Sequence, residues 1–382
     1  MSGMRFGLVA GEASGDLLGA GLIRALKAKV PDAVFEGVAG PAMIEAGCER
    51  WEDADVLAVM GLVEPLKHLP ELLRLRRNLT ERWQADPPDV FIGIDAPDFN
   101  LGLETRLRES GIRTAHYVSP TVWAWREGRV RKIAKAADCV LCILPFEKAF
   151  YDKHGVRAEF VGHPKADSAP ETIDVDGSRR ALGLEGNGPV VAVLPGSRRS
   201  EIARLGPLFA SAATLLKERY PDIRFVTPIA TDRLRPSIEQ HLADAGIADS
   251  FTLTDGQSQL AMCAADVVLL ASGTAALESA LLQRPTVASY KVAPLTAFIV
   301  RTFGLLKVAN VTMPNQLTDP PLVPEFIQGD ARPDALAGAV SELLDSPERR
   351  AGISERFAKL RAELALDADL RAAEAVLSLA RQ

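Results

Sequence analysis

The chain has 382 residues, 47% of them hydrophobic and 25% charged, which is enough for two domains that each bury an ordinary core. Its formal net charge of −6 excludes general attraction to nucleic acid, so any basic patch has to be local. No apolar run reaches the roughly 18 residues of a membrane-spanning helix, and no secretory signal precedes the first strand-like segment. We therefore expect an intracellular protein that is not integral to a membrane.

The first half of the chain alternates strand-like and helix-like segments. Apolar strand-like runs are followed by segments with apolar residues at helical spacing, such as 15–30, 101–111 and 128–137. The strand-like runs are 4–10, 88–95, 114–121 and 137–145. Apolar strands that alternate with helices predict a parallel sheet covered on both faces.

The same pattern restarts after a polar segment rich in Pro, Gly and Asp. Strand-like runs recur at 189–197, 223–230, 265–273 and 285–290. We predict an α/β protein of two facing Rossmann-like, doubly wound domains with a cleft between them. The expected parts are an N-terminal Rossmann-like domain (1–165), a linker with a short helix (166–188), a C-terminal Rossmann-like domain (189–350) and C-terminal helices (351–382). The last helices are expected to cap the domains or to cross to the other domain or to a dimer partner.

Ligands of open parallel sheets bind where the strands end, so the residues after each apolar run are the candidates for chemistry. Glu12 follows the first run, and Asp95 and Asp98 follow the second. A carboxylate in such a place suits a general base that takes a proton from a hydroxyl group. The alternatives are a helix cap at Glu12 or Ser14 and an Asx turn before Pro97.

A third strand end carries His116, Ser119, Trp123 and Trp125 within ten residues. Ser119 and Trp123 are candidates for substrate contact, since aromatic faces stack on sugars, although ordinary packing explains the tryptophans equally well. His163, by contrast, is expected to be a structural hydrogen-bonding residue.

Two turns in the second half combine a strand end with a helix start. The first contains Gly196, Ser197 and Arg198, and the second contains Ser272, Gly273 and Thr274, followed by Glu278. Helix N-termini and an arginine fork bind phosphate, which predicts a site for a nucleotide diphosphate with Glu278 near the ribose. A simple helix cap is the alternative for each turn alone.

The sequence predicts neither a metal site nor a bound cofactor. Cys139 and Cys142 have C-x-x-C spacing but lie in an apolar run without a second pair, so all four cysteines are expected to be buried thiols. The three D-x-D patterns, at Asp53, Asp174 and Asp367, follow no apolar strand and are interpreted as solvated surface.

A leucine-rich segment with neighbouring basic residues is a candidate membrane or acyl-chain contact. Lys67, Arg74, Arg76 and Arg77 accompany its apolar residues, which are Leu62, Val63, Leu66, Leu69, Leu72 and Leu73. A helix that faces the core is the alternative.

The motifs VAGEASGD, GIDAPDFN, HYVSPTVWAW, LPFEKAFY, LPGSR and LLASGTAALE resemble the lipid-A-disaccharide synthase family, in family order from Val9 to Gln328. The resemblance implies an inverting glycosyltransferase of the GT-B type that acts in lipid A and lipopolysaccharide biosynthesis. The implied donor is UDP-2,3-diacylglucosamine, the acceptor is 2,3-diacylglucosamine 1-phosphate, and the products are the β-1,6-linked disaccharide 1-phosphate and UDP.

The resemblance also carries over residue roles and a location. It implies that Glu12 and Asp95 are needed for activity, that Arg198 binds the donor and that Asn315 lies in a cleft loop, where Gln316 departs from the family's usual Leu. It implies a peripheral protein at the cytoplasmic face of the inner membrane, with homodimers through C-terminal exchange. Two rival functions are another UDP-sugar enzyme, such as a 2-epimerase or a different transferase, and a non-catalytic nucleotide-binding protein.

Overall fold

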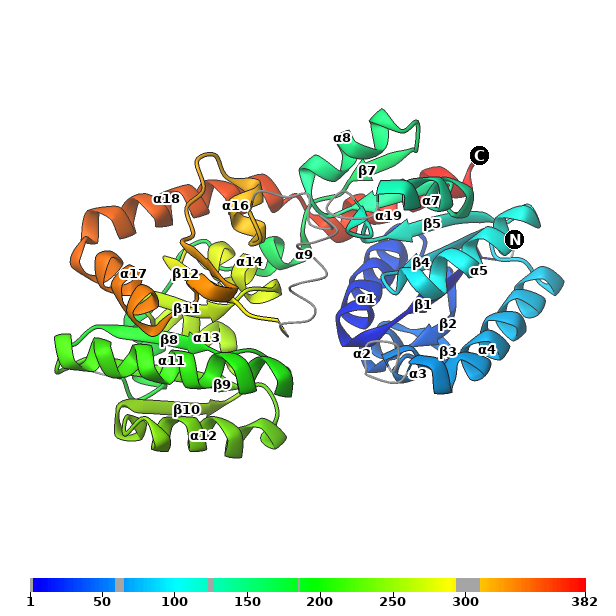
Figure 1. Ribbon diagram of the computed structural model, residues 1–382. Helices are drawn as coiled ribbons and strands as arrows, with labels where there is room; N and C mark the ends of the chain where they lie inside the picture. The colour runs from blue at the N-terminus through cyan, green and yellow to red at the C-terminus, as the bar shows by residue number, and fades with distance from the viewer. Residues whose placement is uncertain (1–2, 59–64, 123–126, 185, 293–309) are drawn as a thin grey trace. The chain divides into compact units, whose positions relative to one another are not determined.

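The computed structural model describes residues 3–58, 65–122, 127–184, 186–292 and 310–382 (Figure 1). The chain divides into two compact units, which are described separately below. The first consists of Met1–Asp167 and Leu364–Gln382, and the second of Ser168–Glu363.

The first unit is built on a seven-stranded parallel sheet in the order β3-β2-β1-β4-β5-β6-β7. The central strands β1 and β4 are adjacent, with Ala10 in register with Ile94. The strands are β1 (Arg5–Ala10), β2 (Val34–Ala39), β3 (Cys48–Asp53), β4 (Val90–Ile94), β5 (Arg113–Tyr117), β6 (Cys139–Cys142) and β7 (Ala158–Phe160).

Helices cover both faces of this sheet because successive strand residues point to opposite sides. On β1, Leu8 belongs to the core beneath α1, α2 and α19, whereas Val9 belongs to the core beneath α4 and α5. The helical segments of the unit are α1 (Glu12–Lys29), α2 (Pro41–Ala46), α3 (Asp55–Ala58), α4 (Pro65–Ala85), α5 (Pro97–Glu109), η2 (Glu127–Arg129), α7 (Val130–Ala136), α8 (Pro145–Lys153), α9 (Pro164–Ser168) and α19 (Ala368–Ala380).

The second unit contains a six-stranded parallel sheet in the order β10-β9-β8-β11-β12-β13. Its strands are β8 (Val190–Leu194), β9 (Arg224–Ile229), β10 (Phe251–Asp255), β11 (Val267–Ala271), β12 (Thr286–Tyr290) and β13 (Glu325–Ile327). Both sheets are parallel with helices between their strands, so the predicted two-domain α/β fold is confirmed.

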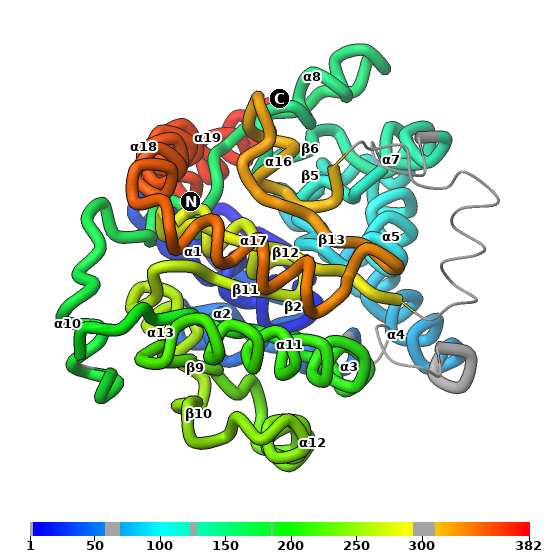
Figure 2. Tube along the Cα trace, turned by 60° about the vertical axis from the view of Figure 1, so that its left-hand side comes forward, coloured from blue at the N-terminus to red at the C-terminus, as the bar shows by residue number. Residues whose placement is uncertain are grey.

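Helix α11 contacts α12 and α17, and α13 contacts α10 and α14. Figure 2 shows α11, α12, α13 and α17 around the strands of this sheet. The helical segments of this unit are α10 (Val175–Ala181), α11 (Arg199–Arg219), η3 (Asp232–Leu234), α12 (Arg235–Asp244), η4 (Ala248–Ser250), α13 (Ser258–Ala264), α14 (Thr274–Leu281), α16 (Met313–Leu317), η5 (Gln328–Asp330), α17 (Pro333–Asp345) and α18 (Pro347–Leu364). Helix α10, from the segment expected to be a linker, packs against α13 of this unit.

The last helix, α19, packs against α1 and therefore belongs to the first unit of the same chain. Its start is fixed by Asp167, whose carboxylate accepts hydrogen bonds from the backbone N–H groups of Asp367 (3.0 Å) and Ala368 (2.7 Å). An aspartate at a helix N-terminus also interacts favourably with the helix dipole.

All four cysteines are buried and free, as expected from the sequence. In the part of the chain that the structure describes, no helix is long and apolar enough to cross a membrane.

Candidate functional site

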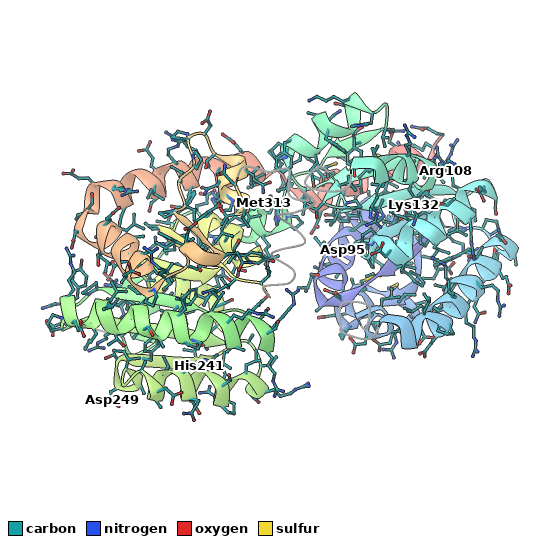
Figure 3. The ribbon with its side chains drawn as sticks, in the orientation of Figure 1. Asp95, Arg108, Lys132, His241, Asp249 and Met313 are labelled. Atoms are coloured by element: carbon teal, nitrogen blue, oxygen red, sulfur yellow. The ribbon has the colours of Figure 1, made fainter. Side chains whose placement is uncertain are left out.

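A pocket of about 210 Å³ lies in the first unit, where β1 and β4 end. Glu12 is the first residue of α1. Asp95, labelled in Figure 3, follows the last residue of β4. The pocket is lined by Gly11, Glu12, Leu57, Asp95, Ala96, Pro97 and Asp98. The structure thus brings together all three carboxylates that the sequence suggested for catalysis.

The backbone of this pocket is strained at both strand ends. Glu12 (φ 63°), Asp95 (φ 53°) and Ala96 (φ 42°) adopt left-handed conformations without being glycine. Each such residue costs on the order of 1–3 kcal/mol and persists only where the surroundings hold it in place. Such strain is concentrated at functional sites in proteins, which fits the position of these residues in the pocket.

The two aspartates of the pocket differ in their surroundings. Asp98 is exposed, and its carboxylate is bound by the guanidinium of Arg129, a residue that sequence reasoning missed. Asp95 is half-buried, and its carboxylate has no hydrogen bond or ion pair to any residue that the structure describes. A group without a protein partner remains available to a substrate hydroxyl, which favours Asp95 over Asp98 as the base.

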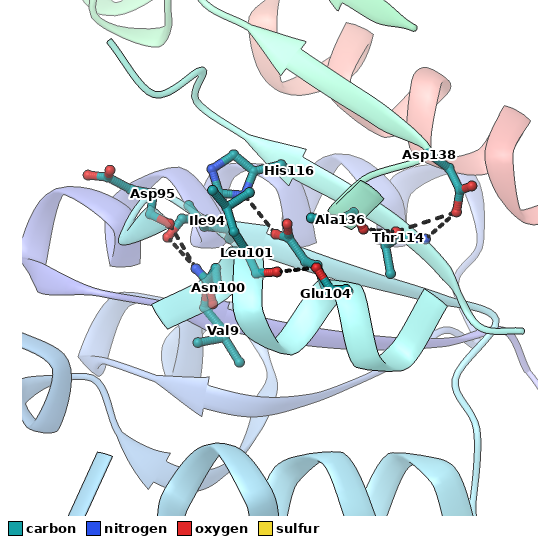
Figure 4. A network of polar contacts seen from close by, with 11 residues as sticks. Val9, Ile94, Asp95, Asn100, Leu101, Glu104, Thr114, His116, Ala136 and Asp138 are labelled. Atoms are coloured by element: carbon teal, nitrogen blue, oxygen red, sulfur yellow. Dashed lines mark hydrogen bonds and ion pairs between the residues drawn. The ribbon is translucent and has the colours of Figure 1, made fainter. Parts of the chain in front are cut away.

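A buried polar network lies behind Asp95 (Figure 4). The side-chain amide of Asn100 donates to the carbonyl oxygen of Asp95, and the carboxylate of Glu104 contacts Nδ1 of His116 at 2.7 Å. Burial raises the pKa of the Glu104 carboxyl, and the neighbouring His116 partly offsets that rise. Nothing local in the sequence marks Asn100 and Glu104, since both lie on the apolar face of α5.

Ser119, a candidate for substrate contact, and His163, expected to be structural, both make hydrogen bonds inside the first unit. Ser119 is buried, and its hydroxyl bonds to the hydroxyl of Tyr151 (2.9 Å) and donates to the carbonyl of Pro120 (3.1 Å). His163 is buried, which lowers its pKa to about 4, and its Nδ1 accepts from the backbone N–H of Lys165. Trp123 lies outside the described residues.

In the second unit, the turn before α11 already holds an anion of its own. The carboxylate of Glu201 accepts hydrogen bonds from the backbone N–H groups of Ser197 (3.0 Å) and Arg198 (3.2 Å). A Cβ on Gly196, which has φ +123°, would lie 2.6 Å from the Cβ of Glu201, so only glycine fits there. The Glu201 carboxylate thus occupies the two amides that the sequence suggested for a diphosphate, whereas the Arg198 side chain is 78% exposed.

In the turn before α14, unlike the turn before α11, backbone N–H groups remain without a protein partner among the described residues. The backbone N–H of Ser272 donates to Ser289 on β12, which fixes the turn at the end of β11. Gly273 and Thr274 follow, both exposed, and their backbone N–H groups have no partner among the described residues. Glu278 lies one helical turn further along α14. The N-terminus of α14 is therefore the better anion site of the two turns.

A hollow of about 600 Å³ in the second unit lies elsewhere, where β8, β9 and β10 begin. Gly188, Arg224 and Phe251 contribute to its lining. Ligands of such sheets bind at the opposite edge, where strands end, so we do not assign the donor to this hollow.

Asn315 is buried and its side-chain amide is saturated by the protein. Its Nδ2 donates to the carbonyl of Val323 and the carboxylate of Glu325, each at 2.7 Å. Its Oδ1 accepts from the backbone N–H groups of Leu322 and Val323. Because every donor and acceptor of this amide is used within the protein, Asn315 holds its loop together in this structure, and its side chain has no free donor or acceptor for a substrate.

The leucine-rich segment splits into exposed and buried parts. Leu69 and Leu73 are each 44% exposed on α4, whereas Leu72 is 5% exposed and packs in the core beneath that helix. Leu72 is therefore withdrawn from the candidate membrane contact. Leu62 and Val63 lie outside the described residues, as does the side chain of Leu66.

Among the described residues, no group of three or more His, Cys, Asp or Glu side chains could hold a metal ion.

Two parallel sheets, each covered by helices, are typical of the GT-B class of α/β fold, and solved structures superpose on 94–100% of the chain. A glycosyltransferase from Rickettsia africae matches with a TM-score of 0.64 and 12% identity, covering 100% of this chain and 99% of that one. A UDP-GlcNAc 2-epimerase from Neisseria meningitidis, solved with UDP-GlcNAc, matches with a TM-score of 0.61 and 14% identity, covering 94% and 99%. At this level of identity, the likeness shows the fold alone.

The chain belongs to the lipid-A-disaccharide synthetase family, whose model matches residues 6–378. The lipid-A-disaccharide synthase of Xanthomonas campestris pv. campestris (strain 8004) is 52% identical, covering 100% of this chain and 87% of the relative. The lipid-A-disaccharide synthase of Alkalilimnicola ehrlichii is 50% identical and covers 99% of both chains. The resemblance inferred from the motifs is thereby confirmed.

Proposed function

We propose that the chain transfers 2,3-diacylglucosamine from UDP-2,3-diacylglucosamine to 2,3-diacylglucosamine 1-phosphate, with inversion at the anomeric carbon. The products are the β-1,6-linked disaccharide 1-phosphate and UDP. The observation that carries this proposal is about 50% identity to lipid-A-disaccharide synthases along the full chain. The partly buried Asp95 in a strand-end pocket supports it independently, since the reaction needs a base.

In this reaction, the 6-hydroxyl of the acceptor attacks the anomeric carbon on the face opposite the departing UDP. Asp95 accepts the hydroxyl proton as the new C–O bond forms, which makes the oxygen a stronger nucleophile. Glu12 lines the same pocket with a carboxylate that has no partner among the described residues, so it is suited to bind acceptor hydroxyls.

The departing diphosphate gains negative charge as the glycosidic bond to it breaks. Arg198 offers an exposed guanidinium, whose fork of N–H donors matches a phosphate oxygen pair. The backbone N–H groups at the start of α14 supply a second set of donors, and Ser272 and Thr274 add hydroxyls. Donors fixed before the reaction stabilise the developing charge without reorganisation. We assign Glu278 to the ribose hydroxyls.

The test mixes the purified protein with both acylated substrates and follows UDP release together with the disaccharide by mass spectrometry. Formation of both products in equal amounts is the expected result. Turnover of UDP-N-acetylglucosamine alone would instead identify a 2-epimerase or a different transferase. Binding of UDP without turnover of the lipid pair would identify a non-catalytic nucleotide-binding protein.

We further propose that the exposed side of α4 rests on the inner membrane at its cytoplasmic face, where the acylated substrates reside. Leu69 and Leu73 supply apolar surface, and the exposed Arg74 and Arg77 supply positive charge for anionic lipid.

A homodimer through exchange of the C-terminal segment would replace the contact of α19 with α1 by the same contact from a second copy. Light scattering after size exclusion tests that state.

A further inference from the structure

The strained strand ends that carry Glu12 and Asp95 need something to hold them. Left-handed residues without glycine relax unless neighbouring groups fix their backbone. The backbone N–H of Asp95 is fixed by the carbonyl of Tyr117 on β5, at 2.9 Å. Its carbonyl group points to the other side, into the protein interior behind the pocket (Figure 4).

Asn100 binds the chain at the ends of both strands. Its Nδ2 lies 2.8 Å from the carbonyl oxygen of Asp95, 3.3 Å from that of Ile94 and 3.2 Å from that of Val9. The side chain is completely buried. One amide group therefore joins the end of β1, just before Glu12, to the end of β4, just before the strained pair at Asp95 and Ala96.

The position of Asn100 is itself fixed by its surroundings. Its backbone N–H donates to the carbonyl of Ala96 in the first turn of α5. One turn later, Glu104 contacts His116 of β5, and both side chains are fully buried. Gly93 leaves room for this packing, since a Cβ there would lie 2.1 Å from Oε1 of Glu104 and 2.9 Å from Cβ of Asn100. The amide cannot shift without displacing a packed helix.

We propose that Asn100 is a positioning residue of the transfer reaction, because its amide holds the Asp95 carbonyl and thereby sets the direction of the Asp95 carboxylate. The inference rests on the proposed function, in which Asp95 is the base. Asn100 does not touch substrate, so its effect passes through Asp95. A misplacement of a catalytic group by about 1 Å can cost roughly 100-fold in rate.

The test variant is Asn100→Leu, which keeps the approximate volume and removes the amide. Its matched control is Thr114→Val, since Thr114 is also fully buried on the same side of the sheet. Its hydroxyl donates to the carbonyl of Ala136 at 2.7 Å and lies 3.4 Å from Oδ2 of Asp138. We expect kcat to fall about 10- to 100-fold in Asn100→Leu and to stay within about twofold of normal in Thr114→Val. The KM for the UDP-sugar is expected to stay unchanged in both.

A double-mutant cycle separates positioning from a general loss of structure. Asn100→Leu in an Asp95→Asn background is expected to lower kcat by no more than about twofold, while its effect on Tm stays the same in both backgrounds. An equal loss of kcat in both backgrounds would overturn the inference, as would an equal loss in Thr114→Val. If Asn100→Leu does not fold, Asn100→Ser enters the same cycle, because its smaller side chain leaves the packing less crowded.

The outcome also distinguishes the inference from the proposed function. Normal turnover in Asp95→Asn alone would remove Asp95 from its role as base, whatever Asn100 does. Alternatively, Asp95→Asn could be slow while Asn100→Leu lowers its kcat by the same factor as in the unchanged chain. That result would keep Asp95 as the base and overturn only the positioning role of Asn100.

Discussion

The carboxylate of Glu201 binds both the backbone N–H and the guanidinium of Arg198. Oε2 of Glu201 accepts from the backbone N–H of Arg198 at 3.2 Å, and Oε1 accepts from the guanidinium at 3.0 Å. The carboxylate thus takes the backbone donors of the turn and leaves the remaining guanidinium N–H groups facing outward. An arginine held in this way meets an incoming phosphate with its side chain alone.

The first prediction concerns donor binding by this arginine. Arg198→Ala is expected to raise the KM for the UDP-sugar about 10- to 100-fold, since hydrogen bonds to charged groups contribute roughly 1.5–3 kcal/mol. Arg199→Ala is the matched control, because Arg199 is adjacent and exposed but lies in the first turn of α11. Steady-state kinetics with varied donor measures both, and an unchanged KM in Arg198→Ala would remove it from the donor site.

The second prediction separates the two aspartates of the first unit. Asp95→Asn is expected to lower kcat about 10²- to 10⁴-fold, the range of a lost general base. Asp98 is exposed and paired with Arg129, and an exposed ion pair contributes little. Asp98→Asn keeps the size of the side chain and is therefore expected to lower kcat less than tenfold. Rates at saturating substrates decide the matter, and the reverse order of the two variants would make Asp98 the base.

The third prediction concerns the membrane. Replacing both Leu69 and Leu73 by Ser is expected to reduce binding to vesicles of anionic phospholipid, because apolar area is lost where the helix would meet lipid. Leu215→Ser is the control, since Leu215 is 40% exposed on α11 of the second unit. Co-sedimentation with the vesicles measures the bound fraction. Equal binding by all three proteins would contradict a role of α4.

The fourth prediction concerns Leu72, which lies beside Leu73 in the sequence but in the core of the structure. Leu72→Ala is expected to lower the free energy of unfolding by about 2–4 kcal/mol through the cavity it leaves. The neighbouring Leu73→Ala, on the exposed side, is expected to change it by less than about 1 kcal/mol. Denaturant titration of the two variants checks the difference, and equal losses would show that Leu72 is not a core residue.

The fifth prediction concerns the cysteines. Burial raises the pKa of the Cys48 thiol to about 12 and that of Cys139 to about 11, from an ordinary value near 9.0. Thiolate is the reactive form, so at pH 8 the native protein is expected to react with a thiol reagent far more slowly than the unfolded protein. Rapid modification of the native protein would contradict the burial of these thiols.

The same shifts have a consequence for stability. Above pH 9 the thiols ionise in the unfolded chain before they ionise in the folded one, so their contribution to stability is complete below that pH and decreases above it. Unfolding measured between pH 8 and about pH 11 in a Cys48→Ala variant, compared with the unchanged chain, isolates the part due to Cys48.

Much of the fold and part of the site follow from local sequence. Apolar runs separated by helical patterns predict parallel sheets, and the residues after those runs lie at the edge where strands end. This reasoning identifies Glu12 and Asp95, which the structure brings into one pocket. It works because strand residues and the turn that follows them are neighbours in the chain as well as in space.

Only the tertiary structure decided which polar groups are free and which are used. Asn315 is saturated by the backbone of Leu322 and Val323 and by the carboxylate of Glu325. Asn100 reaches back 91 residues to Val9, and α19 returns to the first unit. Leu72 is buried and Leu73 is exposed, because only one side of α4 packs on the core. Sequence patterns determine which segments form helices and strands, but partners far apart in the chain are chosen by packing, and packing exists only once the segments have come together.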